Sequence, residues 1–194
     1  MPIGLFLLVH LFTNGLAMAN PHAFDVGAQV LDSMPALFAA EIILIYLPLL
    51  YHGLYGLFIV AYSRFKNMPA YAYPRNAYYW WQRFTGIVLI LFIGWHAITI
   101  RFGVFNLNFW TEHDPTFTVM AHTFNPLVFA AYIIGVIATS YHFCNGLWAF
   151  GVTWGVTIGP KAQRSASRFW MASAVVMAAL WLAIATTFFL ASKG

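Results

Sequence analysis

Four histidines each lie inside a different apolar stretch of the chain. The clearest case is the stretch from Asn125 to Thr153, which contains no Asp, Glu, Lys or Arg but keeps His142 well inside. Three other apolar stretches repeat the pattern around His10, His52 and His96. An ionisable group at membrane depth is costly and usually faces a bundle interior, where it has a partner. Four such imidazoles on four helices therefore suggest axial ligands for two haems.

Two imidazoles on one haem iron would fill both axial positions and leave no position open for oxygen or substrate. This favours electron transfer over catalysis at iron. The chain has one cysteine, Cys144, and no Cys-x-x-Cys-His sequence, so the haems must be held non-covalently. For any one membrane histidine, a structural hydrogen bond or a proton relay is the simpler interpretation. Four histidines, one to a helix, are harder to explain in that way.

The composition places these helices in a membrane. The chain of 194 residues is 62% hydrophobic and only 7% charged, whereas soluble domains have roughly 25% charged residues. We predict an all-α integral membrane protein, a single membrane domain over residues 1–194 in which five transmembrane helices form a bundle around two stacked haems. The helices are expected at about residues 2–18, 38–63, 79–102, 125–153 and 169–190. Because the first begins only nine residues before His10, we expect it to start upstream of this sequence.

The charged residues predict the orientation of the bundle. The loops after the second and fourth helices hold seven of the nine Lys and Arg, and the loops after the first and third hold four of the five acidic residues. Basic loops stay in the cytoplasm, so the amino terminus is expected inside and the carboxyl terminus outside. The net charge of +4 is therefore a membrane signal and does not imply nucleic acid.

At about 1.5 Å per residue, His96, only five residues before Arg101, is expected in the outer half of the membrane, and His142 in the inner half. The positions of His10 and His52 along their helices do not decide between the halves, and parsimony assigns His10 to the outer half and His52 to the inner half. We predict that each pair binds one haem iron. The remaining histidines are expected in or next to outer loops, where imidazole is readily solvated, and not as ligands; they are His22, His113 and His122.

Several motifs around these histidines also occur in one known family. They are Asp32-Ser33-Met34-Pro35, the run from Leu47 to Gly56, the run from Gln82 to Ile87, Trp95-His96, the run from His142 to Trp148, and the run from Thr153 to Thr157. With them the chain resembles, over nearly its whole length, the single-chain, five-helix dihaem cytochrome b anchor of bacterial succinate dehydrogenases and fumarate reductases. The resemblance implies that His10 and His96 ligate the outer haem, and His52 and His142 the inner one.

The resemblance also implies partners and a function. A flavoprotein with FAD and an iron–sulfur protein would bind on the cytoplasmic face of the inner membrane. Electrons would pass from the iron–sulfur subunit through the inner and outer haems to a quinone, expected to be menaquinone, near the outer haem. The family's polar segment ahead of the first helix is not in this sequence. The last helix lacks the glutamate that some fumarate reductases use to move protons, so that proton path is not carried over.

Further residues are candidates for this function. Asp32 and Glu41, near the outer end of the second helix, are candidates for the quinone and proton site, unless they are carboxylates that face water. Arg83 and Lys161 are possible partners of the haem propionates. The basic, aromatic-rich segment 64–83 is the candidate docking face for the soluble subunits. A plain positive-inside signal would explain the basic residues equally well.

Two other interpretations remain open. A haem-free small transporter or proton channel with a histidine relay would need polar helix faces between the histidines, whereas the first three helices are mostly Leu, Ile, Phe and Gly there. A structural membrane anchor whose haems are vestigial is the other interpretation.

Overall fold

The computed structural model describes residues 2–62, 74–102 and 116–194, and these parts of the chain form helices joined by short turns and no strand. The elements in chain order are α1 (Pro2–Gly15) with η1 (Leu16–Met18), α2 (Pro21–Asp32), α3 (Leu37–Glu41) with η2 (Ile42–Tyr46) and α4 (Leu47–Tyr62), α5 (Pro74–His96) with η4 (Ala97–Arg101), α6 (Thr116–Thr123), α7 (Pro126–Thr153), and α8 (Pro160–Ala191). The prediction of an all-α protein is therefore confirmed.

Four helical segments of the described chain are long and apolar enough to cross a membrane: Leu37–Tyr62, Asn76–Arg101, Pro126–Thr153 and Pro160–Ala191. The chain is therefore a multi-pass membrane protein. Pro2–Met18, the fifth predicted crossing, is also an apolar helix but is shorter than these four.

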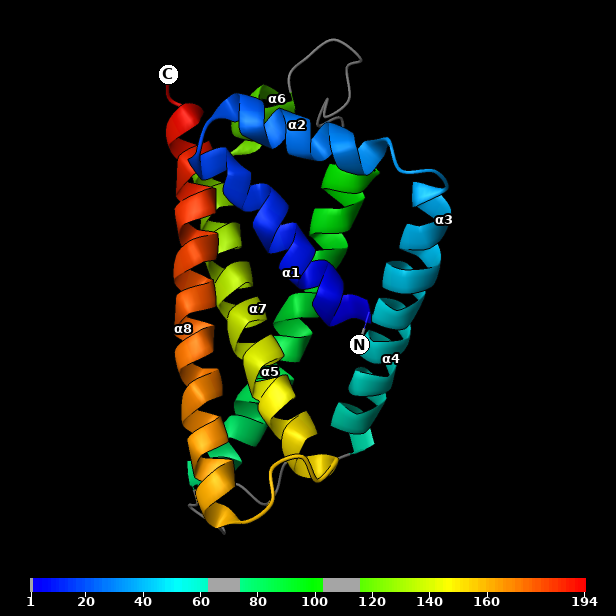
Figure 1. Cartoon of the computed structure of the whole chain (residues 1–194), viewed down its shortest axis with the longest axis vertical. Coiled ribbons are helices and arrows are strands. Elements are labelled where there is room, and N and C mark those ends of the chain that lie inside the picture. Colours follow the sequence, from blue (N-terminus) through cyan, green and yellow to red (C-terminus); the bar gives the residue numbers. More distant parts are fainter. Residues whose placement is uncertain (1, 63–73, 103–115) are drawn as a thin grey trace.

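The long helices form a bundle that is covered at one end (Figure 1). Helix α7 packs against α8 on one side and α5 on the other, and α1 runs diagonally from α4 towards α8. Helix α2 lies across one end of the bundle, which also holds α6 and the carboxyl terminus. The connection from α7 to α8 lies at the opposite end. We call these the α2 end and the α8-start end.

Two segments predicted as loops contain helices instead. Residues 20–35 include α2, which begins where Asn20 caps the helix by accepting a hydrogen bond of 2.8 Å from the Ala23 amide. Proline at the first helical position, here Pro21, favours such a start. Residues 103–123 include α6, whose Phe117 amide donates to the Asp25 carboxylate at 2.7 Å. This bond joins α2 and α6 into the cover of the bundle.

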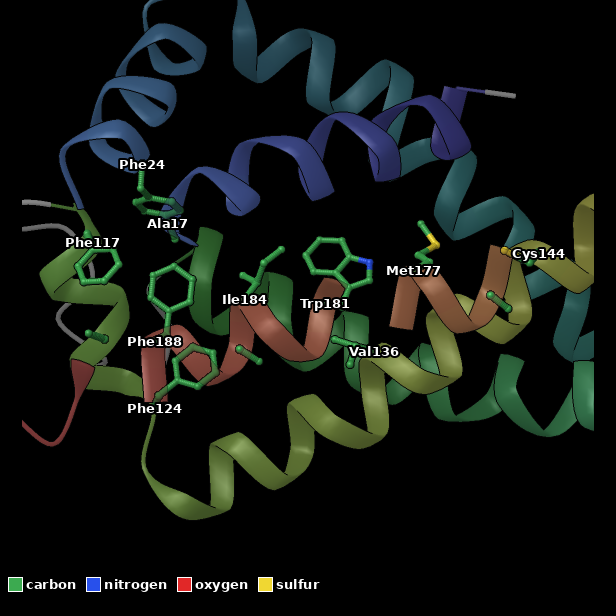
Figure 2. Packing of buried hydrophobic residues seen from close by; sticks show 13 residues of the cluster. Ala17, Phe24, Phe117, Phe124, Val136, Cys144, Met177, Trp181, Ile184 and Phe188 are labelled. Atoms are coloured by element: carbon green, nitrogen blue, oxygen red, sulfur yellow. The ribbon is translucent and has the colours of Figure 1, made fainter. Parts of the chain in front are cut away.

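Aromatic side chains hold the cover to the bundle. Phe24 of α2 and Phe117 of α6 both contact Phe188 of α8, with ring centres 5.3 and 5.2 Å apart, and Phe124 stacks on the same ring. Figure 2 shows this cluster continuing along α8 through Trp181 towards the middle of the bundle. The core of the described chain is thus concentrated between α8, α7 and the cover.

Helix α8 begins at Pro160 instead of near residue 169, as the sequence predicted. Gly159, with a φ of 85°, ends the preceding turn, and Pro160 is the first helical residue. Proline suits this position because the N–H that it lacks would have no acceptor in the first turn of a helix. The basic residues expected in a loop therefore lie on the first turns of α8; they are Lys161, Arg164 and Arg168.

The second long helix includes a π-helical turn. Segment η2 (Ile42–Tyr46) joins α3 to α4, and Pro48 follows it directly. Because proline cannot donate to the carbonyl four residues earlier, a local change in the hydrogen-bond pattern accommodates it. No residue of α3, η2 or α4 is buried, so this helix lies at the edge of the described bundle.

Candidate functional site

The structure brings the four histidines together as two pairs. The rings of His10 on α1 and His96 at the end of α5 have centres 6.0 Å apart and are inclined by 73°. The rings of His52 on α4 and His142 on α7 have centres 6.1 Å apart and are inclined by 85°. Each pair therefore joins two helices that are not consecutive along the chain.

The two pairs lie at different heights in the bundle. His96 is in the last turn of α5, and α1 carries His10 towards the same end, the α2 end. His52 lies past the midpoint of the continuous helical segment Leu37–Tyr62, and His142 lies past the midpoint of α7, so both are nearer the α8-start end. The two heights correspond to the two depth classes expected from the sequence.

The ring of His96 is held by side chains of α7 and α5. Its Nδ1 forms a hydrogen bond of 2.9 Å with the Tyr132 hydroxyl, which leaves Nε2 for a ligand. Phe92, one turn earlier on α5, stacks near the same imidazole with ring centres 5.9 Å apart. Phe92 in turn lies against Gly135, where a Cβ would come within 2.5 Å of the phenyl ring. The close approach of α5 and α7 thus depends on a glycine.

His10 sits among aromatic and amide groups. Its ring is 5.6 Å from Trp181 of α8 and 5.3 Å from Phe6, measured between ring centres. The amide nitrogen of Asn14, one turn further along α1, donates to the His10 carbonyl at 2.8 Å and lies 3.3 Å from Nδ1. As at His96, the second ring nitrogen, Nε2, is left for a ligand.

His142 is held by polar groups of α5. Its Nδ1 lies 3.1 Å from the carbonyl oxygen of Gln82 and 3.3 Å from the Thr85 hydroxyl. The Gln82 side chain donates to the His142 carbonyl at 3.1 Å and accepts from the Asn145 amide at 2.7 Å. Asn145 is only 3% exposed. Gln82 therefore bonds to one turn of α7 through both its backbone and its side chain.

Close packing brings α5 up to the His142 ring. A Cβ on Gly86 would lie 3.2 Å from Cε1 of that ring and 3.7 Å from Nδ1. His52 faces this imidazole from α4 and is exposed within the described chain. The His142 side of the pair is thus packed firmly, whereas the His52 side lies on the edge helix.

The spacing of both pairs fits a metal held between the two rings. A metal bonded to imidazole nitrogen lies about 2.0–2.1 Å from it, and the nitrogen lies roughly 1.1 Å from its ring centre, so the two ring centres would be roughly 6 Å apart. The observed separations are 6.0 and 6.1 Å. Among the described residues no cluster of three or more His, Cys, Asp or Glu could hold a metal ion. The separation within each pair is therefore compatible with the predicted axial ligation of a haem, and the role of the four histidines as ligands stays a prediction.

One known protein is similar over most of this chain. The succinate dehydrogenase cytochrome b558 subunit of Bacillus subtilis (strain 168) is 40% identical over 164 residues, which cover 84% of this chain and 78% of that protein. The chain belongs to this family of succinate dehydrogenase cytochrome b subunits. No protein-family model matches it, and no solved structure matches it.

Glu41 forms an ion pair near the α2 end. Nε and Nη2 of Arg101, the last residue of η4, each lie 3.0 Å from Glu41 Oε2. Arg101 also bonds to the Tyr46 side chain, and both charged side chains are partly buried, Glu41 at 16% exposure and Arg101 at 33%. Asp32, the other predicted acid, is exposed at the end of α2.

The two predicted propionate partners lie towards the α8-start end. The Arg83 guanidinium is 3.7 Å from the ring centre of Tyr79, one turn earlier on α5. Lys161 is exposed on the first turn of α8. Their assignment to a cofactor stays a prediction. The part of the predicted docking face before residue 74, like His113, lies outside the described residues.

Sequence reasoning missed the residues that hold the imidazoles. Gln82 was noted only as part of a motif, and Tyr132, Asn145 and Trp181 were given no role. Of these residues, only Asn145 could have been found from the sequence, because it is a polar residue inside an apolar stretch. Arg101 was used only to estimate the depth of His96. Because Arg101 and Glu41 are both charged and both expected near the outer membrane boundary, Arg101 was a candidate ion-pair partner for Glu41.

Proposed function

We propose that this chain is the membrane anchor of a succinate dehydrogenase complex: a single membrane domain over residues 1–194, with five transmembrane helices that hold two non-covalent haem b groups. The observation that carries the proposal is the presence of two imidazole pairs whose spacing fits axial ligation. The similar Bacillus protein is named a cytochrome b558 subunit of succinate dehydrogenase. The imidazole pairs and the name of this relative both favour haem b as the cofactor.

In this proposal His10 and His96 ligate the outer haem, and His52 and His142 ligate the inner one. When bound, each haem would supply an iron that reversibly takes up one electron. The chain's own contribution is to fill both axial positions and to fix the rings. Hydrogen bonds from Nδ1 of a ligating histidine orient its ring and strengthen it as a ligand. Tyr132 has this role at His96, and the Gln82 carbonyl has it at His142.

We further propose that the chain connects soluble subunits on the cytoplasmic side with a quinone on the outer side. A flavoprotein with FAD would oxidise succinate, and an iron–sulfur subunit would pass the electrons to this anchor. The start of α8 and of α5 would face these subunits, because basic residues mark the cytoplasmic side. The amino terminus would lie in the cytoplasm and the carboxyl terminus outside the inner membrane. Arg83 and Lys161, at the cytoplasmic end, would pair with propionates of the inner haem.

The quinone, for which we propose menaquinone, would react near the outer pair. Glu41 and Asp32 lie towards the α2 end, where quinone reduction needs protons, and Arg101 would keep Glu41 in place between turnovers. Electrons that move outward while protons are taken up outside would be driven by the membrane potential, at about 2.3 kcal/mol per charge per 100 mV. Succinate oxidation by a low-potential quinone would benefit from this contribution.

Haem content tests the proposal directly. A pyridine haemochrome assay on the purified complex should give two b haems per chain, and a reduced-minus-oxidised spectrum should show both. His142→Ala should remove the inner haem alone, whereas His22→Ala, an exposed control in α2, should keep both. One haem or none in the wild-type chain would refute the proposal, and no haem at all would favour a haem-free histidine relay.

The quinone site has a separate test. Glu41→Gln should slow quinone reduction while succinate oxidation with a soluble acceptor stays at the wild-type rate. A structure with a quinone-site inhibitor bound should show it at the outer end. An inhibitor bound beside the start of α5 would overturn the outer site without affecting the assignment of the haems.

A further inference from the structure

Trp181 carries a buried hydrogen-bond donor that the described chain leaves without an acceptor. The residue is 8% exposed, and its Nε1 has no hydrogen-bond partner within the described part of the chain. A buried indole N–H usually finds an acceptor. Trp148 follows this rule, because its Nε1 donates to the Gln163 carbonyl at 3.1 Å. We therefore expect the Trp181 N–H to donate a hydrogen bond to an acceptor outside the described residues.

The position of Trp181 indicates where this acceptor belongs. Its ring centre is 5.6 Å from that of His10, and the two rings are tilted by 44°. Figure 2 shows the indole between α8 and α1, with its nitrogen on the side of Met177. The buried side chains one turn to either side on α8, Met177 and Ile184, are apolar and supply no oxygen. The donor thus lies beside one ligand of the His10–His96 pair, in apolar surroundings.

We propose that Trp181 binds the ligand at the His10–His96 pair by donating its indole N–H to an oxygen atom of that ligand. The inference rests on the proposed function, and it adds α8 to a site whose two imidazoles come from α1 and α5. Indole nitrogen is a donor only, so the ligand must present an acceptor. Two groups share this chemistry, the propionate carboxylate of the outer haem and the carbonyl of the quinone.

The test removes the N–H and keeps the ring. In the assembled complex, Trp181 is replaced by benzothienylalanine, in which sulfur takes the place of the indole N–H and the bicyclic shape is kept. Trp181→Phe is the genetically simpler second variant. Trp148→Phe is the matched control, because it removes an indole N–H whose acceptor is a protein carbonyl. Haem content is measured first and should be two per chain in each variant.

The two possible acceptors give different results. If the acceptor is a propionate, losing the donor leaves its negative charge less compensated, so the midpoint potential of the outer haem falls and that of the inner haem stays unchanged. If the acceptor is a quinone carbonyl, the KM for quinone rises about five- to tenfold, the effect of one lost hydrogen bond, and both potentials stay unchanged. Either result supports the proposal, and the Trp148→Phe control should show neither.

An ultraviolet resonance Raman difference between the wild type and the Trp181→Phe variant gives an independent measurement of the wild-type indole. A hydrogen-bonded Trp181 supports the proposal, whereas a free indole overturns it. Potentials and KM equal to those of the control also overturn it. If the wild type holds two haems and Trp181 has no effect, only this inference fails. A wild type without haem would refute the proposed function itself.

Discussion

Gln82 offers the sharpest test of how the protein orients an axial imidazole. Gln82→Leu removes the side-chain bond to the His142 carbonyl, at 3.1 Å, and the bond from the Asn145 amide, at 2.7 Å. It keeps the Gln82 backbone carbonyl that faces His142 Nδ1. Leucine is close to glutamine in size and is a strong helix former. The substitution therefore removes polar contacts from the site without deleting the ligand.

The magnitude follows from the burial of Asn145. This residue is 3% exposed, so its amide would lose the Gln82 acceptor in a place that water does not reach. Leaving a buried polar group unsatisfied costs about 1–3 kcal/mol, and we expect the free energy of unfolding to fall by that amount. Changing a group that orients a metal ligand typically weakens metal affinity by about 10–100-fold. We expect the inner haem to be weakened on this scale and the outer haem to be unaffected.

The assay compares haem retention and thermal stability. Purified Gln82→Leu complex is washed in detergent, and the remaining haem is measured by pyridine haemochrome and by the reduced-minus-oxidised spectrum. The Gln29→Leu variant is the matched control, because Gln29 is exposed on α2. If both variants keep two haems with equal Tm and equal spectra, the side chain of Gln82 has no part in holding His142 and the reasoning is wrong.

Two further predictions concern packing and charge. Arg101→Gln should lower the free energy of unfolding by about 1–2 kcal/mol, because it leaves the partly buried Glu41 carboxylate unpaired. The double variant with Glu41→Gln should recover most of this loss in thermal unfolding, and strictly additive losses would contradict the pairing. Gly135→Ala should lower the free energy of unfolding by about 1–3 kcal/mol, because the new Cβ would lie 2.5 Å from the Phe92 ring. Gly56→Ala, whose Cβ meets nothing within 4 Å, should leave Tm unchanged or raise it, and equal shifts for both glycines would refute this packing argument.

The sequence was sufficient to separate His96 from His142 in height because depth depends only on position along an apolar helix, whereas His10 and His52 were assigned by parsimony. A rise of about 1.5 Å per residue converts the distance of His96 from Arg101 directly into depth. The structure then brings together the same partners, His10 with His96 and His52 with His142. Their role as iron ligands stays a prediction, because pairing shows proximity and not coordination.

The polar shell of the site could not be predicted in the same way. Gln82 and His142 are 60 residues apart, and His96 and Tyr132 are 36 apart. Which side chains meet across two helices depends on the rotation of each helix about its axis, and hydropathy does not specify that rotation in membrane helices that carry apolar residues on every face. The short helices were missed for a different reason. Asn20-Pro21 is a favourable helix start, but the segment was predicted as a connecting loop without use of this signal.

The two π-helical segments let this chain lose a residue where a regular helix could not. Successive residues of an α-helix are turned by about 100°, and a π-helical turn accommodates an extra residue. Deleting one residue from η4 would restore a regular α-helix and leave the end of the segment facing nearly the same way, because the π-turn had absorbed that residue. Arg101 would then still face Glu41, and His96, which precedes the segment, would keep its place. Deleting one residue from the regular part of α5 would instead turn the end of the helix by about 100° and separate the two charged groups. Among relatives, a gap of one position within η4 is therefore compatible with the ion pair wherever both charged residues are retained.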